Sequence, residues 1–299
     1  MIEKALLNQT IKLKDGRNLG YAEFGNVNGK SIFYFHGHGT SRLEPKMYDL
    51  ENVKDNFRLI GVDRPGFGLS DFNQKHTLLS WPDDIAELAD ALSIDKFSVL
   101  GGSGGAPFAL ACAYKIPNRL ISCGIVSGLG PIKLGIEDMA KNQRKELEMA
   151  QKNPKRLNFV FKLIVKFLDK LKQEPIEEVK KKLLKRGKNL PEADKKFFED
   201  TDNCYLYMEL MGESLRQGIA GPRHESILLA SPWGFELGEI SPDLKINSWH
   251  GKLDPNVPIR MARAMCKEIP NCEMKIYDNL GHLSPAINNI EEIITTLIS

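Results

Sequence analysis

The sequence predicts an α/β fold in which a mostly parallel sheet, covered by helices on both faces, is interrupted by a helical insertion. Unbroken apolar runs that end in glycine-rich loops read as buried strands, at residues 31–35, 57–62, 97–100 and 121–126. Helical patterns lie between them, at residues 79–92 and 106–114. Buried strands that alternate with helices are typical of a parallel sheet. Such a sheet binds its ligands beyond the carboxyl ends of its strands, which is where these loops fall.

The elements before and after the insertion complete this pattern. Residues 10–24 alternate polar and apolar side chains around Asp15-Gly16, which predicts a hairpin. From residue 131 the β pattern stops and the chain reads as helix. It returns with strands at 244–250 and 273–277 and helices at 256–268 and 285–298. We therefore expect a first core segment at 1–130, a helical cap at 131–235 and a second core segment at 236–299.

Composition narrows the class of protein. The chain has 299 residues, of which 42% are hydrophobic and 27% charged, so a disordered or collagen-like chain is excluded. The most apolar stretch, residues 157–168, contains two lysines and is too short to span a membrane. Residues 1–17 lack the apolar core of a signal peptide. The five cysteines are scattered and include no C-x-x-C pair, so we expect reduced thiols and a cytoplasmic protein.

Charge is distributed unevenly. The net charge is +2, but residues 141–200 hold 18 Lys and Arg against 10 Asp and Glu. No nucleic-acid-binding module accompanies this excess, so no nucleic-acid partner is expected. The basic insertion is open to several interpretations: a surface for acidic substrates, anionic lipid or a partner protein, or a solvated lysine-rich face. The sequence is also compatible with a homodimer.

The segment Gly101-Gly102-Ser103-Gly104-Gly105 lies between a predicted strand and a predicted helix. It matches G-x-S-x-G, in which a sharp turn strains the central serine and exposes its hydroxyl at a helix N-terminus. Glycine two residues to either side avoids a collision of side chains. The dinucleotide pattern G-x-G-x-x-G fails because Pro107 stands at its third position, and no Gly-Lys-Ser/Thr follows to make a P-loop.

A serine nucleophile needs a base that a third group orients. Asp254 follows the predicted strand 244–250, and His282 follows the strand 273–277. Both loops belong at the same sheet edge as Ser103. We therefore expect His282 to take the serine proton and Asp254 to hold its tautomer.

The oxyanion of an acyl-transfer reaction needs backbone donors. We expect one from the N–H of Gly104, directly after the nucleophile, and one from the N–H of His38 in the loop His36-Gly37-His38-Gly39. The H-x-H pair also suggests a metal, but Thr40 and Ser41 follow where a metallo-hydrolase carries Asp-His. No metal and no cofactor are expected.

In this order, these motifs resemble the α/β-hydrolase superfamily, in its esterase and proline-iminopeptidase-like branch. The H-G-x-G loop, residues 63–68, the Ser103 elbow, the segment ending at Asp254 and Gly281-His282 carry the resemblance, which covers residues 10–130 and 236–299. It implies a serine hydrolase with the triad Ser103, Asp254 and His282. Dehalogenases and epoxide hydrolases of this superfamily use an aspartate nucleophile. Proline iminopeptidases usually carry H-G-G-P-G and a tryptophan after the serine, where this chain has His38 and Gly104.

The expected substrate is a small or medium carboxylic ester. Trp233 and Phe235, where the insertion rejoins the core, either line the acyl pocket or seal the hinge. An aminopeptidase with the same triad would need a carboxylate for the substrate amine, for which Glu209 and Glu213 are candidates. A binding protein that keeps the triad but turns over little is a third hypothesis. Arg42 could meet a substrate carboxylate or form a scaffold ion pair with Asp63 or Glu44.

Overall fold

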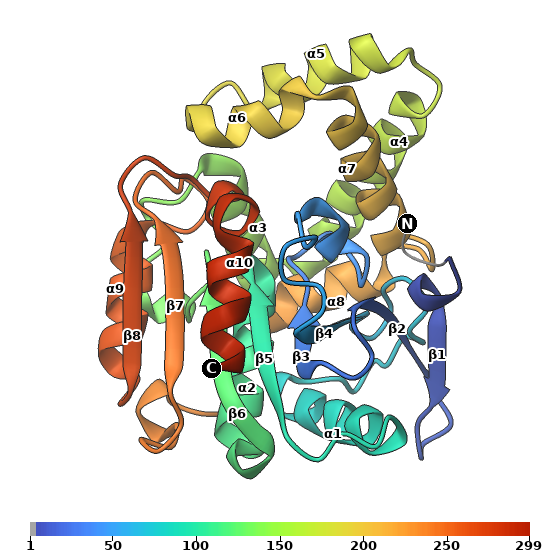
Figure 1. The fold of residues 1–299 in the computed structure, drawn as a ribbon. Coiled ribbons are helices and arrows are strands. Elements are labelled where there is room, and N and C mark those ends of the chain that lie inside the picture. Colours follow the sequence, from blue (N-terminus) through green and yellow to red (C-terminus); the bar gives the residue numbers. More distant parts are fainter. Residues whose placement is uncertain (1–3) are drawn as a thin grey trace.

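The computed structural model describes residues 4–299 and contains one eight-stranded sheet (Figure 1). The first three residues of the predicted core segment 1–130 lie outside the described part. The strands lie in the order β1-β2-β4-β3-β5-β6-β7-β8. Their bounds are β1 Gln9–Lys12, β2 Asn18–Gly25, β3 Lys30–Phe35, β4 Phe57–Val62, β5 Phe97–Gly102, β6 Leu120–Val126, β7 Ile246–Gly251 and β8 Cys272–Tyr277.

All pairings from β4 to β8 are parallel, and β1 and β2 pair antiparallel at one edge. The hairpin predicted at residues 10–24 is confirmed, since β1 pairs with β2 and Gly16 at the turn has a φ of 88°. The mostly parallel sheet predicted from the apolar runs is likewise confirmed.

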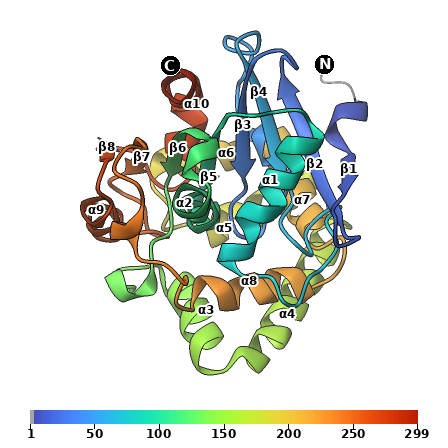
Figure 2. The same cartoon turned by 90° about the horizontal axis from the view of Figure 1, so that it is seen from below.

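Helices cover both faces of the sheet (Figure 2). On one face, α1 Trp81–Ala91, α2 Ala106–Lys115 and α9 Ile259–Glu268 contribute to one buried apolar cluster, which also includes Phe33 and Phe35. On the other, α10 Ser284–Ile298 packs against Tyr34. The alternation of side chains along β3 sends neighbouring residues to opposite faces, so both faces bury apolar surface.

Six helices lie between β6 and β7, and Figure 1 shows α5, α6 and α7 above the sheet. Their bounds are α3 Lys141–Lys152, α4 Leu157–Leu171, α5 Ile176–Arg186, α6 Glu192–Glu199, α7 Thr201–Ser214 and α8 Ala220–Leu229. Short 3-10 helices are η1 Lys4–Leu7, η2 Glu44–Met47, η3 Leu78–Ser80, η4 Ser103–Gly105, η5 Pro117–Arg119, η6 Ile132–Leu134, η7 Pro154–Arg156 and η8 Leu237–Glu239. The segment boundaries 131 and 235 stay a prediction.

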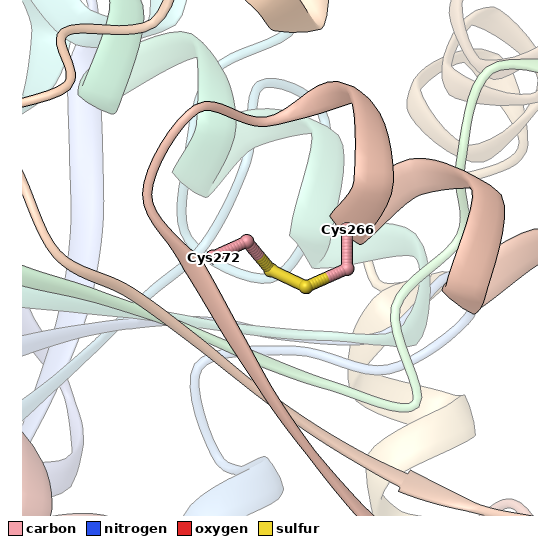
Figure 3. The surroundings of a disulfide bond; sticks show 2 residues. All are labelled: Cys266 and Cys272. Atoms are coloured by element: carbon pink, nitrogen blue, oxygen red, sulfur yellow. A yellow bond between two sulfur atoms is a disulfide. The ribbon is translucent and has the colours of Figure 1, made fainter.

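One disulfide corrects the expectation of five reduced cysteines. Cys266 in α9 and Cys272 at the start of β8 are joined, with their Cα atoms 5.4 Å apart (Figure 3). The chain reverses from the helix into the strand between them, and this turn brings two cysteines six positions apart together. Cys112, Cys123 and Cys204 are free and buried. The cysteine argument for a reducing compartment therefore fails, and the cytoplasmic location stays a prediction without that support.

Candidate active site

Ser103 sits on the sharp turn that the glycine pattern predicts. It follows β5 directly and has a φ of 49°, a backbone conformation that residues other than glycine rarely adopt. A Cβ atom on Gly101 would lie 2.6 Å from the carbonyl oxygen of Gly105, and one on Gly105 would lie 2.0 Å from the carbonyl oxygen of Phe35. Both positions therefore require glycine. The surrounding chain keeps Ser103 in its strained backbone conformation.

His282 and Asp254, the two partners expected for Ser103, lie beside it. His282 is within hydrogen-bonding distance of both Ser103 and Asp254. Nε2 of His282 is 2.9 Å from Oγ of Ser103, and Nδ1 of His282 is 2.7 Å from Oδ2 of Asp254. The other carboxylate oxygen of Asp254 accepts the N–H groups of Asn256 and Val257 at 2.8 and 2.9 Å. These bonds fix the carboxylate and, through it, the orientation of the imidazole.

The charges around His282 favour its protonated form. Burial by itself lowers the pKa of this imidazole, but the charge and hydrogen bond of Asp254 outweigh it, and Asp194 and Glu44 add to the effect. The pKa of His282 is therefore raised above its usual value. A base with a raised pKa takes up a proton readily and, once charged, serves as an acid.

The two predicted oxyanion donors lie side by side. A Cβ atom on Gly104 would lie 3.0 Å from the backbone nitrogen of His38 and 2.9 Å from its Cβ. Only a residue without a side chain therefore lets the loop after β3 approach the N-terminus of α2 so closely. Their role as an oxyanion hole stays a prediction.

The side chain of His38 lies between two glutamates of the insertion, which the sequence did not indicate. Its Nδ1 is 2.8 Å from Oε1 of Glu225 in α8, and its Nε2 is 3.0 Å from Oε1 of Glu146 in α3. Burial opposes the charge, yet the two carboxylates raise the pKa of His38 to about 10. Arg64 also binds Glu225, at 2.7 Å. Both glutamates are more than 100 residues from His38, so no local spacing marks them.

Asp194 of α6 binds the loop that carries His282, and it too was missed. Its side chain is fully buried, and its Oδ2 accepts the N–H of His282 at 2.7 Å. Its Oδ1 accepts the N–H of Ser284 at 3.0 Å and the hydroxyl of Ser284 at 2.6 Å. The carboxylate thus caps the N-terminus of α10 from a distant part of the chain.

Glu44 joins the loop after β3, which carries Gly37 and His38, to the cavity at Ser103. Its Oε2 accepts the N–H of Gly37 at 2.7 Å, and the hydroxyls of Tyr34 and Thr40 also donate to the carboxylate. Glu44 does not pair with Arg42. Arg42 pairs instead with Asp63, at 2.8 Å, which is the scaffold ion pair expected as one of its alternatives.

A cavity of about 40 Å³ lies directly beside Ser103. It is lined by Glu44, Met47, Tyr48, Gly102, Ser103, Val126, Ser127, His282, Leu283, Ala286 and Ile287.

Trp233 and Phe235 do not line this cavity, and their role in substrate binding stays a prediction beside the alternative that they seal the hinge. Both are buried in the core, and the ring of Phe235 stacks on Tyr114 of α2 with the centroids 4.9 Å apart. Trp233 contacts Phe235 at 5.9 Å between ring centroids. The large apolar surface of these rings is used to pack the returning chain against the sheet's helices.

The two glutamates considered for an amine site are engaged elsewhere. Glu209 pairs with Lys46 at 2.6 Å, and Glu213 pairs with Arg42 at 2.6 Å. Neither lines the cavity at Ser103. Their charges are matched by basic side chains of the first core segment, and a role for them in amine recognition stays a prediction.

Comparison with known proteins agrees with this geometry. A family model described as the alpha/beta hydrolase fold matches residues 31–286. The chain belongs to the α/β-hydrolase family. The matched region includes Ser103, Asp254 and His282, together with the helices between β6 and β7.

Sequence relatives match this α/β hydrolase over shorter regions. An uncharacterized hydrolase of Saccharomyces cerevisiae, YNR064C, is 31% identical over 140 residues, which is 46% of this chain and 47% of the relative. A proline iminopeptidase of Xylella fastidiosa is 33% identical over 108 residues, covering 35% of this chain and 34% of that protein. The chain thus spans less than half the length of these relatives.

Solved structures share the whole fold of this α/β hydrolase. The esterase RhEst1 from Rhodococcus has a TM-score of 0.67 and 18% identity, covering 98% of this chain and 99% of that one. The esterase EaEST from Exiguobacterium antarcticum also has a TM-score of 0.67, with 17% identity and coverage of 98% of both chains. At identities of 17 and 18%, the similarity to these structures shows a shared fold only. Within residues 4–299, no helix combines the length and apolar character needed to cross a bilayer.

Proposed function

We propose that the protein is a serine hydrolase that cleaves small or medium carboxylic esters through an acyl-enzyme on Ser103. The observation that carries the proposal is the hydrogen-bonded chain from Ser103 Oγ through His282 to Asp254, at 2.9 and 2.7 Å. Such a series of hydrogen bonds activates a serine, because a buried carboxylate holds the imidazole in the tautomer that accepts the hydroxyl proton. Membership of the α/β-hydrolase family supports the same conclusion.

The reaction follows from the positions of these groups. Oγ of Ser103 attacks the ester carbonyl carbon while its proton moves to Nε2 of His282. The tetrahedral intermediate collapses as the imidazolium gives that proton to the departing alcohol oxygen, leaving the acyl group on Ser103. A water molecule then repeats the sequence with His282 as base, and the acid is released.

Two backbone N–H groups would hold the negative oxygen in both steps. His38 and Gly104 are assigned this role because their backbones lie together beside Ser103. Gly104 is also near the N-terminus of α2, where the helix dipole favours negative charge. The loop that carries His38 is fixed by Glu44 through Gly37 and by Glu225 through His38 itself.

The helices between β6 and β7 would act as a cap that excludes water and limits the substrate. Asp194, Glu146 and Glu225 support this role, since all three reach from these helices to the loops at the site. The esterases among the solved structures of the same fold agree with an ester substrate.

An aminopeptidase with the same three residues is the second candidate, and the partial match to a proline iminopeptidase supports it. It is disfavoured because Glu209 and Glu213 are paired with Lys46 and Arg42. A binding protein with little turnover is the third hypothesis. Parallel assays with acyl esters and amino-acid anilides separate the first two.

The deciding experiment labels the protein with a fluorophosphonate and locates the adduct by intact mass and peptide mapping. We expect one adduct on Ser103, no adduct in Ser103→Ala, and loss of ester turnover in that variant by about 10⁴-fold or more. Unlabelled, folded protein would favour the binding-protein hypothesis. Undiminished turnover by Ser103→Ala would place the nucleophile elsewhere.

A further inference from the structure

Helix α4 of the insertion exposes two large apolar side chains one turn apart. Phe159 is 67% exposed and Leu163 is 48% exposed, and residues four positions apart on a helix lie on the same face. The other exposed large hydrophobic side chains in the described part of the chain each come from a different element or loop. Exposed apolar groups that lie together, rather than singly, point to an interaction surface.

This pair is additional to the apolar face with which α4 packs on the protein. The helix contacts α3, α7 and α8. Its buried side chains lie on the side opposite to Phe159 and Leu163, and they are Leu157, Phe161, Leu168 and Leu171. The packing of α4 within the insertion is therefore complete without the exposed pair.

Basic side chains surround the pair. Each of them is exposed and lies three or seven positions from Phe159 or Leu163, so it shares their side of the helix. These basic residues are Arg156, Lys162, Lys166 and Lys170. We call the surface formed by these four residues with Phe159 and Leu163 the outer face of α4.

The positive charge of the outer face has no acidic counterpart. None of its four basic residues has an ion-pair partner within residues 4–299. Asp169 is the one acidic residue of α4, and it pairs with Lys172 at 3.8 Å. Lys162, Lys166 and Lys170 follow one another at intervals of four positions, a spacing at which like charges destabilise a helix.

Both features are unfavourable in water, and both are relieved at an anionic lipid surface. Phe and Leu side chains leave water when they enter the region of the lipid headgroups, while Lys and Arg keep their charges among those headgroups. Anionic headgroups also attract the basic residues and reduce their mutual repulsion. A nucleic-acid backbone would match the charges but would give the leucine no apolar surface. We propose that the outer face of α4 docks on anionic membranes, with Phe159 and Leu163 inserted between the headgroups.

The docking helix also contacts the loop beside Ser103. Phe161, on the buried side of α4, meets the imidazole of His38 edge-on, with the ring centroids 6.2 Å apart. A docked molecule would therefore hold this loop about one helix diameter, ~10 Å, from the lipid. The proposal adds a binding surface to the proposed function and does not depend on ester hydrolysis.

Co-sedimentation with vesicles tests the proposal without any substrate. The vesicles consist either of phosphatidylcholine alone or of equal parts of phosphatidylcholine and phosphatidylglycerol. We expect about 100-fold stronger binding to the anionic vesicles, since each Lys or Arg near such a surface strengthens binding about fivefold. Binding should weaken as NaCl rises from about 0.05 to about 0.5 M, because salt screens the attraction.

A first set of variants tests the charges. Lys162→Gln, Lys166→Gln and Lys170→Gln combined should weaken binding to the anionic vesicles by about 100-fold. The matched control removes three exposed lysines near β7 and β8, which lie on the opposite side of the molecule from α4 in Figures 1 and 2. Each of these lysines already has an ion pair, at 3.0, 2.7 and 2.6 Å, and the control variant combines Lys245→Gln, Lys252→Gln and Lys275→Gln. It changes the net charge equally and should bind within about threefold of the wild type.

A second set of variants tests insertion of the apolar pair. Phe159→Ser and Leu163→Ser combined should weaken binding by about tenfold or more, with an unchanged melting temperature because both side chains are exposed. The three native tryptophans are buried, so the indole of Phe159→Trp reports on the outer face of α4. Anionic vesicles should shift its emission to shorter wavelength, and lipid brominated in its acyl chains should quench it. The indole of Ile121→Trp, at a position 45% exposed at the start of β6, is the control and should show neither effect.

Equal binding to the two kinds of vesicle, or no binding to the anionic vesicles at low salt, would overturn the proposal. Wild-type binding by the triple lysine variant of α4 would overturn it as well. If the Phe159 and Leu163 double variant binds like the wild type and the indole of Phe159→Trp stays in water, the protein only adsorbs through its charge and the insertion is refuted. Poly-L-glutamate that binds as tightly as the anionic vesicles, with the same dependence on the apolar pair, would assign the face to an acidic protein instead. Ester turnover enters none of these measurements, so failure of the proposed function is recognised separately, by the labelling of Ser103.

Discussion

Replacing Asp194 by asparagine separates two effects of this residue on His282. The carboxylate accepts the N–H of His282 through one oxygen and binds Ser284 through the other. Asparagine keeps the shape and one oxygen, but it loses the negative charge. With the oxygen kept towards Ser284, its amide nitrogen would face the N–H of His282, a donor against a donor, where the oxygen now lies 2.7 Å away.

The expected loss of stability follows from these contacts. A hydrogen bond to a charged acceptor contributes about 1.5–3 kcal/mol, and the N–H of His282 would be left buried without a partner. The charge also sits at the N-terminus of α10, where it contributes about 0.5–1 kcal/mol. We therefore expect Asp194→Asn to lower the free energy of unfolding by about 3 kcal/mol, and the melting temperature by about 5–10 °C.

The effect on the pH profile has a definite sign. Asp194 is one of the charges that raise the pKa of His282, so its removal lowers that pKa. Because His282 must be neutral to accept the serine proton, the acidic limb of kcat/KM moves to lower pH. At the optimum, the displaced imidazole lowers kcat by about tenfold. A residue with only a structural role would lower kcat and leave the limb where it is.

The assay is kcat/KM for a short nitrophenyl ester between pH 4.5 and 9, together with thermal unfolding. Asp200→Asn is the matched control, because Asp200 also accepts a backbone N–H at a helix start, that of Asp202 at 2.7 Å, but lies at α7. Asp200→Asn should leave the acidic limb of the kcat/KM profile at the pH of the wild type. An acidic limb that stays in place or rises in Asp194→Asn would refute the electrostatic part of the reasoning. An unchanged melting temperature would refute the structural part.

Three further predictions concern residues around the site. His38→Gln should lower the free energy of unfolding by about 2 kcal/mol, since it leaves the buried carboxylate of Glu225 facing the half-buried carboxylate of Glu146. The pKa of His38 is raised to about 10, so the difference from wild type should be full below about pH 6 and shrink as pH rises through 10, as followed by thermal unfolding across that range. Trp233→Ala should cost about 3–5 kcal/mol of stability and leave acyl-chain preference unchanged in an ester panel, and a changed preference would place Trp233 in the pocket. Replacing Cys266 and Cys272 by serine opens a short loop and should cost about 2 kcal/mol, with ester turnover at Ser103 retained at 25 °C.

The sequence predicts those features of the fold and the site that are set by short local patterns of residues. The turn at Ser103 is encoded by glycines two residues to either side, and the loops of Asp254 and His282 follow strands that the apolar runs mark. Parallel strands bring their carboxyl ends to one edge, so three loops distant in sequence could be placed together before any coordinates were known.

What could not be predicted depends on contacts between distant helices and loops. Asp194 lies 88 residues before His282, and Glu225 lies 187 residues after His38. In the sequence each is one acidic residue among 39, in a stretch that reads as amphipathic helix. The two alternatives left open for Trp233 have the same origin, since an aromatic residue at a hinge suits a pocket or a core equally until its neighbours are known.

These distant contacts change how the insertion is understood. Glu225 and Asp194 are almost fully buried, and their partners Arg64, His38 and the N-terminus of α10 all belong to the two core segments. A buried carboxylate without its partner is strongly destabilising, so these helices cannot swing away from the sheet as one body without exposing or orphaning both charges. The same bonds hold the oxyanion loop and the loop of His282. The position of these helices and the geometry of the loops at Ser103 are therefore energetically coupled, because the same buried carboxylates stabilise both.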